Sequence, residues 1–426
     1  MLSVHQHWDP LKVCAVGRCY PPEFFSHIKH PKVRNTFEKI AQETEEDYQG
    51  LIKKLESFGV EVLRTDISED LEIYKQGDVT YPTPPMTPRD YCGMIGDTFY
   101  MPSENYGDNI DAEQFINGFL GGGTSNVLSN FQNYPEIKKY IFDLFLPGRP
   151  VSDLVGNMLL QNYRRNDLEG NLLSSDDREN LKQLFIQAET MTIGSNDKTP
   201  NFKGYYAFNT IREYVKRTNN IIFDSYVNTA CITRVGKDLY IGIGNYINKM
   251  YEKKYMDKWA KLFPGYRLNR VDYPGHIDGC FTPIKPGLVL STKSVDVGHL
   301  FPDWEQVKIP KSLAKSRFKK NKARLRGRYW VSGEEYNDEF NDYMDCYMNH
   351  WVNYAEETTF DINVLIVDEN NVLCTDVNKE MFKVFERHGV TPHVVPFRHK
   401  SFWDGGLHCN TTDIHRDGEQ QDYFPD

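Results

Sequence analysis

The feature that most constrains the fold is a short pattern that recurs along the chain: a strand, a polar or glycine-containing turn, and another strand. Four copies occur, at residues 94–100, 231–241, 281–290 and 365–373. Their turn residues predict β-hairpins. A helix follows some of them, most clearly from Ile247 to Phe263. The repeat indicates a single domain built radially from hairpin–helix–strand units. An ordinary α+β fold with hairpins fits the pattern about as well.

A second repeated pattern stands near each end of the chain. Apolar residues at helical spacing predict a helix over 34–58, Gly59 ends it, and a strand is expected over 60–63. The same order returns with a helix over 380–388, Gly389, and a strand over 390–395. Both ends of the chain therefore carry one unit of the expected repeat.

Composition excludes several classes of protein. The 426 residues are 39% hydrophobic and 26% charged, which is ordinary for a soluble domain, and the net charge is -10. No apolar run approaches the ~20 residues of a membrane span, and the first residues lack the features of a secretion signal. The eight cysteines form no Cys-x-x-Cys pair, so a zinc site is not expected. We predict a cytoplasmic protein without metal or organic cofactor, since scattered thiols suit a reducing compartment.

Two segments do not fit the repeat, so we expect one domain over 1–426 with insertions at 164–203 and 311–345. The first is polar, and the second begins with nine Lys and Arg residues between Lys311 and Arg328, followed by an acidic run. A basic stretch of this kind is usually a solvated surface, but it also permits contact with nucleic acid or an acidic partner.

The residues from Asp404 to Thr411 (Asp-Gly-Gly-Leu-His-Cys-Asn-Thr) hold the strongest chemical signal. The glycines free the backbone, and Cys409 follows at what is predicted to be a strand start. A cysteine thiolate is a strong nucleophile when its pKa is suitably tuned. A lone cysteine beside a turn is nevertheless more often a buried free thiol.

This stretch resembles the active-site end of the guanidino-group modifying enzymes, in particular the amidinotransferases, which carry Gly-Gly-Gly-x-His-Cys-x-Thr around their nucleophile. Asp404 replaces the first glycine here. Residues 363–369 and 381–396 resemble the family's preceding strand, helix and strand. The resemblance implies an α/β fold, a five-bladed pseudo-symmetric α/β propeller of hairpin–helix–strand modules with the active site on its axis.

Two further motifs match the family. Pro88-Arg89-Asp90 stands before the hairpin at 94–100, and in the family this Asp binds the substrate guanidinium, whose planar fork suits a carboxylate. Pro88 predicts an extended chain there. His276-Ile277-Asp278 precedes the hairpin at 281–290, and on a strand both side chains would share one face. In the family the His carries the proton and the Asp helps to hold the substrate. Taken alone, each motif is as easily a solvated turn.

Two positions depart from the family pattern. The family's remaining Asp aligns with Asn228, unless the loop is longer and Asp224 fills the role. The Arg that pairs with the donor's carboxylate aligns with Val295. A pocket without that cation should bind an α-carboxylate poorly. The donor is therefore expected to be a guanidino compound other than free arginine, such as an agmatine-like cation or a larger derivative.

The resemblance implies an amidinotransferase in which Cys409, His276 and Asp278 are catalytic and Asp90 and Asn228 bind substrate. Its partners would be a small guanidino donor and an amine acceptor, with no membrane and no nucleic acid. A homodimer is a further expectation, because relatives often dimerise. Two alternatives stay open: a deiminase-type hydrolase using the same site, and a catalytically inactive binding protein on the same scaffold. His408 is expected to be a structural member of the motif.

Overall fold

The computed structural model describes residues 1–68, 71, 84–102, 207–224, 229–242, 249–272, 276–292, 295–309, 329, 331, 333–334, 337–344 and 360–425. The chain divides into two compact units. Unit 1 comprises Met1–Pro102, Ala207–Asn337 and Val352–Asp426, and unit 2 comprises Ser103–Tyr206 and Asp338–Trp351. Insertion 164–203 and the basic stretch from 311 to 328 lie outside the described residues. In unit 2 the described part is confined to residues 338–344, which include helix α11 (Asp338–Tyr343).

The described strands, in chain order, are β1 (Leu11–Val16), β2 (Glu61–Arg64), β3 (Gly93–Ile95), β4 (Thr98–Pro102), β5 (Asn220–Asp224), β6 (Ile232–Val235), β7 (Asp238–Gly242), β8 (Arg267–Val271), β9 (Phe281–Lys285), β10 (Leu288–Thr292), β11 (Glu305–Ile309), β12 (Leu365–Asp368), β13 (Asn371–Cys374), β14 (Thr391–Val394) and β15 (Thr411–Arg416). The described helices of unit 1 are η1 (Pro22–Phe25), α1 (Pro31–Glu56), α3 (Pro88–Tyr91), α8 (Asn209–Val215), η5 (Thr229–Cys231), α9 (Lys249–Leu262), η6 (Ile277–Gly279), α12 (Lys379–Arg387) and α13 (Lys400–Trp403).

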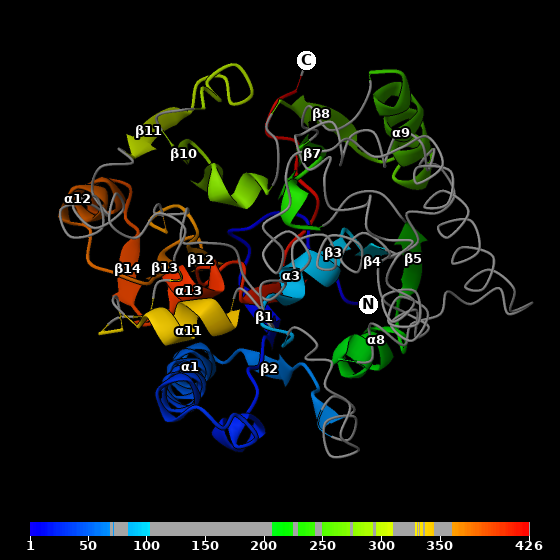
Figure 1. The fold of residues 1–426 in the computed structure, drawn as a ribbon. Coiled ribbons are helices and arrows are strands. Elements are labelled where there is room, and N and C mark those ends of the chain that lie inside the picture. Colours follow the sequence, from blue (N-terminus) through cyan, green and yellow to red (C-terminus); the bar gives the residue numbers. More distant parts are fainter. Residues whose placement is uncertain are drawn as a thin grey trace, which may run out of the picture. The chain divides into compact units, whose positions relative to one another are not determined.

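These strands form five sheets of three strands each, and all five have the same construction. The orders are β15-β1-β2, β3-β4-β5, β6-β7-β8, β9-β10-β11 and β12-β13-β14. In every sheet the first two strands pair antiparallel and the third pairs parallel to the second. Figure 1 shows the five sheets following one another around a common centre within unit 1. The predicted five-bladed α/β propeller is thus confirmed, and the ordinary α+β alternative is wrong.

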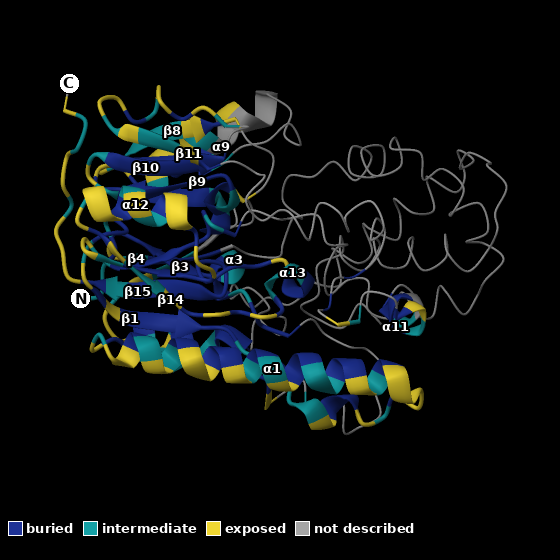
Figure 2. Cartoon of the chain, turned by 90° about the vertical axis from the view of Figure 1, so that its left-hand side faces the viewer, coloured by how far each residue is buried: buried dark blue, intermediate teal, exposed yellow. Residues whose placement is uncertain are grey.

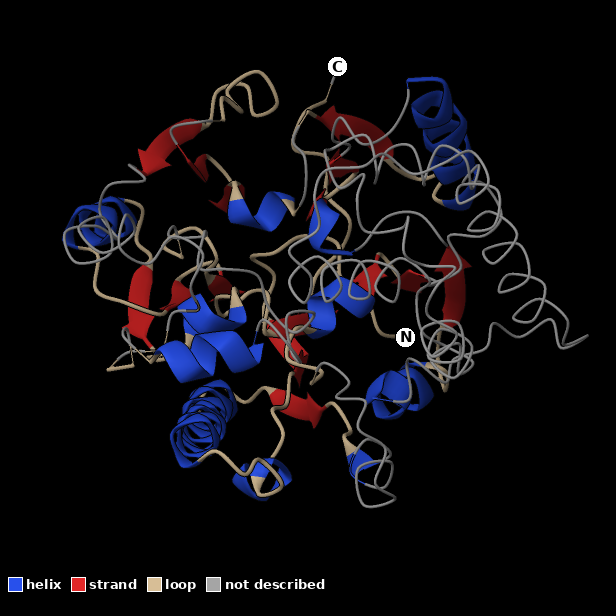
Figure 3. Ribbon diagram, in the orientation of Figure 1, coloured by secondary structure: helices blue, strands red, loops and turns tan. Residues whose placement is uncertain are grey.

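In most of the sheets a helix connects the second strand to its parallel third strand, as is usual for a parallel crossover. This helix is α1, α8, α9 or α12 in four of the sheets. Figure 3 shows these helices on the outside and the strands toward the centre. In Figure 2 the strands are mainly buried, whereas α1 exposes the side that faces away from them. The predicted helix over 34–58 and the four hairpins are confirmed, with shifts of a few residues at their ends.

The first sheet joins the two ends of the chain. Strand β15 pairs with β1 from Leu11 opposite Arg416 to Val16 opposite Thr411. This pairing closes the ring, and it brings the segment before β15 beside segments from the rest of the chain. No helix in the described part of the chain is long and apolar enough to cross a membrane.

Three local predictions about the motifs are wrong. Pro88 is the first residue of the one-turn helix α3, where its missing N–H costs nothing, and the chain is not extended there. Asp278 lies in the 3-10 turn η6 and does not share a strand face with His276. Cys409 lies in a turn, and the strand begins two residues later at Thr411. Each motif therefore sits in a turn just before a strand.

Candidate active site

The motif residues occupy equivalent places in different sheets. Asp90 precedes β3, Asp278 precedes β9 and Cys409 precedes β15, each two or three residues before the first strand of its sheet. Because the sheets share one construction around a centre, these positions converge at the same end of the ring. The same position before β12 is held by Asn363. Asn228 stands four residues before β6 and lies outside the described residues, so its predicted role is untested.

The Cys409 side chain lies in the middle of a polar cluster and is 8% exposed. Asn363 Nδ2 donates to Sγ at 2.9 Å, and Sγ lies 3.5 Å from Asp278 Oδ2. The pKa of the Cys409 thiol is raised well above its usual value, first by burial and then by the carboxylates of Asp278 and Asp90. Burial and these two carboxylates therefore favour the protonated thiol in this structure.

Asp278 is buried, and its two carboxylate oxygens have different surroundings. Oδ2 accepts from His408 Nδ1 at 2.8 Å and from Asn363 Nδ2 at 3.4 Å. Burial alone would raise the pKa of Asp278, but the bond from His408 and nearby positive charge lower it overall. Oδ1 is buried and has no hydrogen-bond partner among the described residues. An ionised oxygen without a partner suits a cationic ligand.

His276 and Asp90 form the other side of the cluster. Nδ1 of His276 is 3.6 Å from Oδ1 of Asp90, an oxygen that is buried without a hydrogen-bond partner in the described structure. Burial lowers the pKa of His276, but the surrounding carboxylates raise it by more, so the pKa is raised overall. Those carboxylates are Asp90, Asp278 and Asp404. The surrounding carboxylates therefore favour the protonated ring more than in a free histidine, which suits a proton donor.

Two residues shape the turn that carries the cysteine. Asp404 adopts the left-handed conformation with φ of 53°, which glycine enters freely and Asp enters more easily than most residues. An Asp is therefore tolerated at this point of the turn. Gly406 packs so closely on Asn363 that an added Cβ would lie 2.6 Å from Asn363 Oδ1. A glycine is therefore required at 406 to let Asn363 reach the cysteine.

A buried charge cluster lies behind the site. Asp413, four residues after Cys409, accepts hydrogen bonds from Arg89, Arg234 and Arg416. Arg89 Nε also donates to the backbone oxygen of His408 at 2.8 Å. The three guanidinium groups hold the pKa of Asp413 well below its usual value despite burial. The cluster ties β15 to the turn that holds Asp90 and to β6.

His408 is buried beside Asp278. Its Nδ1 donates to Asp278, and burial together with the charge of Arg89 lowers the pKa of His408 to about 4. Its Nε2 is buried and has no hydrogen-bond partner among the described residues. The ring therefore stays uncharged at neutral pH and holds Asp278 in one orientation.

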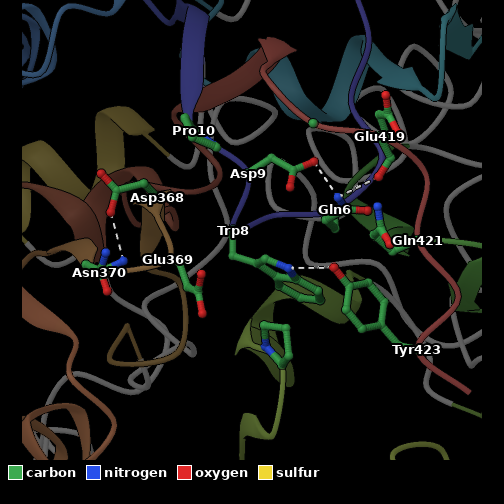
Figure 4. Close-up of a pocket in the computed structure, with 12 residues that line it drawn as sticks. Gln6, Trp8, Asp9, Pro10, Asp368, Glu369, Asn370, Glu419, Gln421 and Tyr423 are labelled. Carbon is green, nitrogen blue, oxygen red and sulfur yellow. Dashed lines mark hydrogen bonds between the residues drawn. The ribbon is translucent and has the colours of Figure 1, made fainter.

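A pocket of about 580 Å³ lies elsewhere, and none of the predicted site residues lines it. Figure 4 shows Trp8 Nε1 donating to Tyr423, and Gln6 Nε2 reaching Asp9 and the backbone of Glu419. These contacts anchor the segment after β15. Within the described residues, no group of three His, Cys, Asp or Glu side chains could hold a metal ion.

Sequence comparison places the chain near two kinds of enzyme. Glycine amidinotransferase of Xenopus laevis is 26% identical over 213 residues, which cover 47% of this chain and 41% of that protein. Inosamine-phosphate amidinotransferase 1 of Streptomyces glaucescens is 22% identical over 202 residues, covering 47% and 49%. The chain thus spans about half or less of the curated relatives it matches. No protein-family model matches.

Two solved structures align along nearly the whole chain. The inosamine-phosphate amidinotransferase of Streptomyces griseus gives a TM-score of 0.49 at 16% identity and covers 99% of both chains. A dimethylarginine dimethylaminohydrolase gives 0.43 at 10% identity, covering 94% of this chain and 99% of that one. The relatives in the sequence comparison confirm the predicted resemblance of this chain to the amidinotransferases among the guanidino-group modifying enzymes.

Proposed function

We propose that this protein is an amidinotransferase, which moves an amidino group from a guanidino donor to an amine through a covalent intermediate on Cys409. The observation that carries the proposal is the convergence of Asp90, Asp278 and Cys409 from three different sheets. Two carboxylate oxygens there are buried without hydrogen-bond partners among the described residues, beside a buried thiol. A guanidinium cation supplies the N–H donors that these oxygens lack.

Binding of the donor would also activate the nucleophile. The carboxylates of Asp278 and Asp90 contribute to the raised pKa of the Cys409 thiol. A guanidinium held between them offsets their negative charge, so the thiol releases its proton more readily in the complex than in the free protein. The thiolate is therefore formed where an electrophile is present, which limits unwanted reactions of the free cysteine.

The steps then follow from the positions of the groups. The Cys409 thiolate forms a bond to the guanidinium carbon, and a tetrahedral intermediate results. His276 gives its proton to the departing amine as the carbon–nitrogen bond breaks, which leaves an amidino group on sulfur. An acceptor amine gives a proton to His276 and bonds to the same carbon, and the carbon–sulfur bond breaks to release the thiolate. If water replaces the acceptor amine in this route, the product is urea. In a deiminase-type hydrolase the first leaving group is ammonia instead, so the substituted nitrogen stays on the carbon and water releases a ureido compound.

The donor is proposed to lack a free α-carboxylate. In the sequence alignment Val295 matches the position of the family's Arg, and its side chain packs against a cluster of buried hydrophobic residues. The charges that act on His276 come from three carboxylates. An environment of this kind repels a carboxylate and favours a donor whose far end is cationic or uncharged.

The test is the intact mass of the protein after brief mixing with arginine, agmatine, guanidinoacetate or a peptide containing arginine. An amidino adduct that is absent from Cys409→Ala would establish the intermediate and identify the donor. Cys374→Ala is the matched control, because Cys374 is another buried thiol but lies at the end of β13. Adduct formation by arginine above all others would disprove the argument from Val295. If no compound marks Cys409, the inactive binding protein becomes the better reading.

A further inference from the structure

Asn363 is a residue to which the family motifs give no role, and it contacts the cysteine in two ways. Its side-chain Nδ2 donates to Cys409 Sγ at 2.9 Å, and its Oδ1 accepts from the Cys409 backbone N–H at 3.0 Å. The side chain is 4% exposed. One amide group therefore fixes both the backbone and the sulfur of the same residue.

We propose that Asn363 is a positioning residue that holds the sulfur of Cys409 and stabilises its thiolate. The inference rests on the proposed role of Cys409 as the nucleophile. Since an amide N–H cannot take a proton from the thiol, its contact with sulfur favours the negatively charged form. The contact distance of 2.9 Å is among the shorter ones for a bond to sulfur, which suits a thiolate acceptor.

The carboxylate of Asp278 beside the sulfur of Cys409 creates a need for a hydrogen-bond donor at this point. Asp278 Oδ2 lies 3.5 Å from Sγ and opposes the loss of the thiol proton. Asn363 Nδ2 lies 3.4 Å from the same oxygen, so one amide nitrogen stands close to both acceptors. A donor at this point separates two groups that would repel each other once the thiol is ionised.

The backbone is built to keep Asn363 in place. Gly406 leaves room for the amide, because a Cβ there would lie 2.6 Å from Oδ1 and 2.8 Å from Cβ of Asn363. The backbone oxygen of Asn363 accepts from the N–H of His408 at 3.4 Å. Asn363 therefore contacts the turn that carries Cys409 through both its side chain and its backbone. Its position just before β12 is equivalent to the positions of Asp90, Asp278 and Cys409 before the first strands of their own sheets.

The test uses Asn363→Asp, which keeps the shape and an oxygen for the Cys409 N–H but replaces the donor with a carboxylate. Asn363→Ala removes both contacts. The matched control is Asn371→Ala, which removes a side chain that donates to Asp368 at 2.9 Å in the same sheet. The rate at which iodoacetamide alkylates Cys409 is measured at a series of pH values from the mass of the peptide that contains Cys409. Thermal unfolding then shows which variants are folded.

We expect the midpoint of alkylation to rise by about one to two pH units in both Asn363 variants, as loss of a hydrogen bond to a charged group predicts. The control should keep the wild-type midpoint. With a donor found as described above, kcat should fall by roughly 10- to 100-fold while KM changes little. A structural role alone would lower the unfolding temperature without moving the midpoint.

A folded Asn363→Asp or Asn363→Ala protein with the wild-type midpoint would overturn the inference. Alkylation does not depend on any substrate, so this outcome is separate from failure of the proposed function. If no guanidino compound modifies the wild-type protein but the midpoint still rises in the variants, the proposed function falls and the effect of Asn363 on the thiolate stands.

Discussion

The Asp413→Asn substitution should destabilise the protein strongly, because it removes the charge that balances three buried guanidinium groups. Asp413 accepts from Arg234 at 2.8 and 3.0 Å, from Arg89 at 3.1 Å and from Arg416 at 2.8 Å. The four side chains are between 0% and 4% exposed. Removing one partner of a buried ion pair costs about 3–5 kcal/mol, and here three cations lose one partner together.

A loss of this size would lower the thermal midpoint by roughly 6 to 20 °C for a domain of ordinary size. Circular dichroism during heating at neutral pH measures it. Asp422→Asn is the matched control, since Asp422 pairs with Arg267 at 2.6 Å on the surface, and its loss should leave the midpoint nearly unchanged. A midpoint for Asp413→Asn within about 2 °C of the wild type would refute the reasoning.

Three further predictions concern the site itself. Activity should fall as the pH rises through the raised pKa of His276, because the protonated ring donates the proton to the leaving amine. A pH–rate profile of His276→Asn that still shows this fall in activity would contradict the prediction. Gly406→Ala should reduce the rate of adduct formation roughly 10- to 100-fold, because the added methyl group displaces Asn363. The circular dichroism spectrum should stay native. An unchanged rate would show that Asn363 has room to move. Asp404→Gly should keep full activity and change the unfolding free energy by less than about 1 kcal/mol, since φ is 53°; a large loss of adduct formation would instead assign the Asp404 carboxylate a direct role.

The architecture could be predicted because its signals are local. Each hairpin is encoded by two apolar runs and a turn, and Gly96, Gly236 and Gly287 adopt the positive φ that such turns require. The periodicity of the sequence could not decide between a propeller and another α+β fold. That choice depends on the pairing of β15 with β1, which lies at the other end of the chain. A contact between residues 11 and 416 leaves no periodic trace in either segment.

The polar network behind the site could not be predicted from the sequence. Arg89, Arg234 and Asp413 are far apart along the chain, and each resembles a surface residue in its own segment, since charged residues are rarely fully buried. Asn228 and the basic stretch 311–328 lie outside the described residues, so their predicted roles remain predictions.

The repeated fold does contain a signal that motif matching overlooks. Asp90 and Asp278 lie three residues before β3 and β9, and Asn363 and Cys409 lie two residues before β12 and β15. Superposing the hairpins in the sequence would therefore have identified Asn363 as a candidate, although the resemblance to the family assigns no role to it. Before β6 the same superposition points to Thr229 and Ala230, which directly follow Asn228. In a ring of equivalent units, a functional residue at one position of a unit indicates that the same position in the other units also holds candidate site residues. The reason is that this position lies near the common centre in every unit.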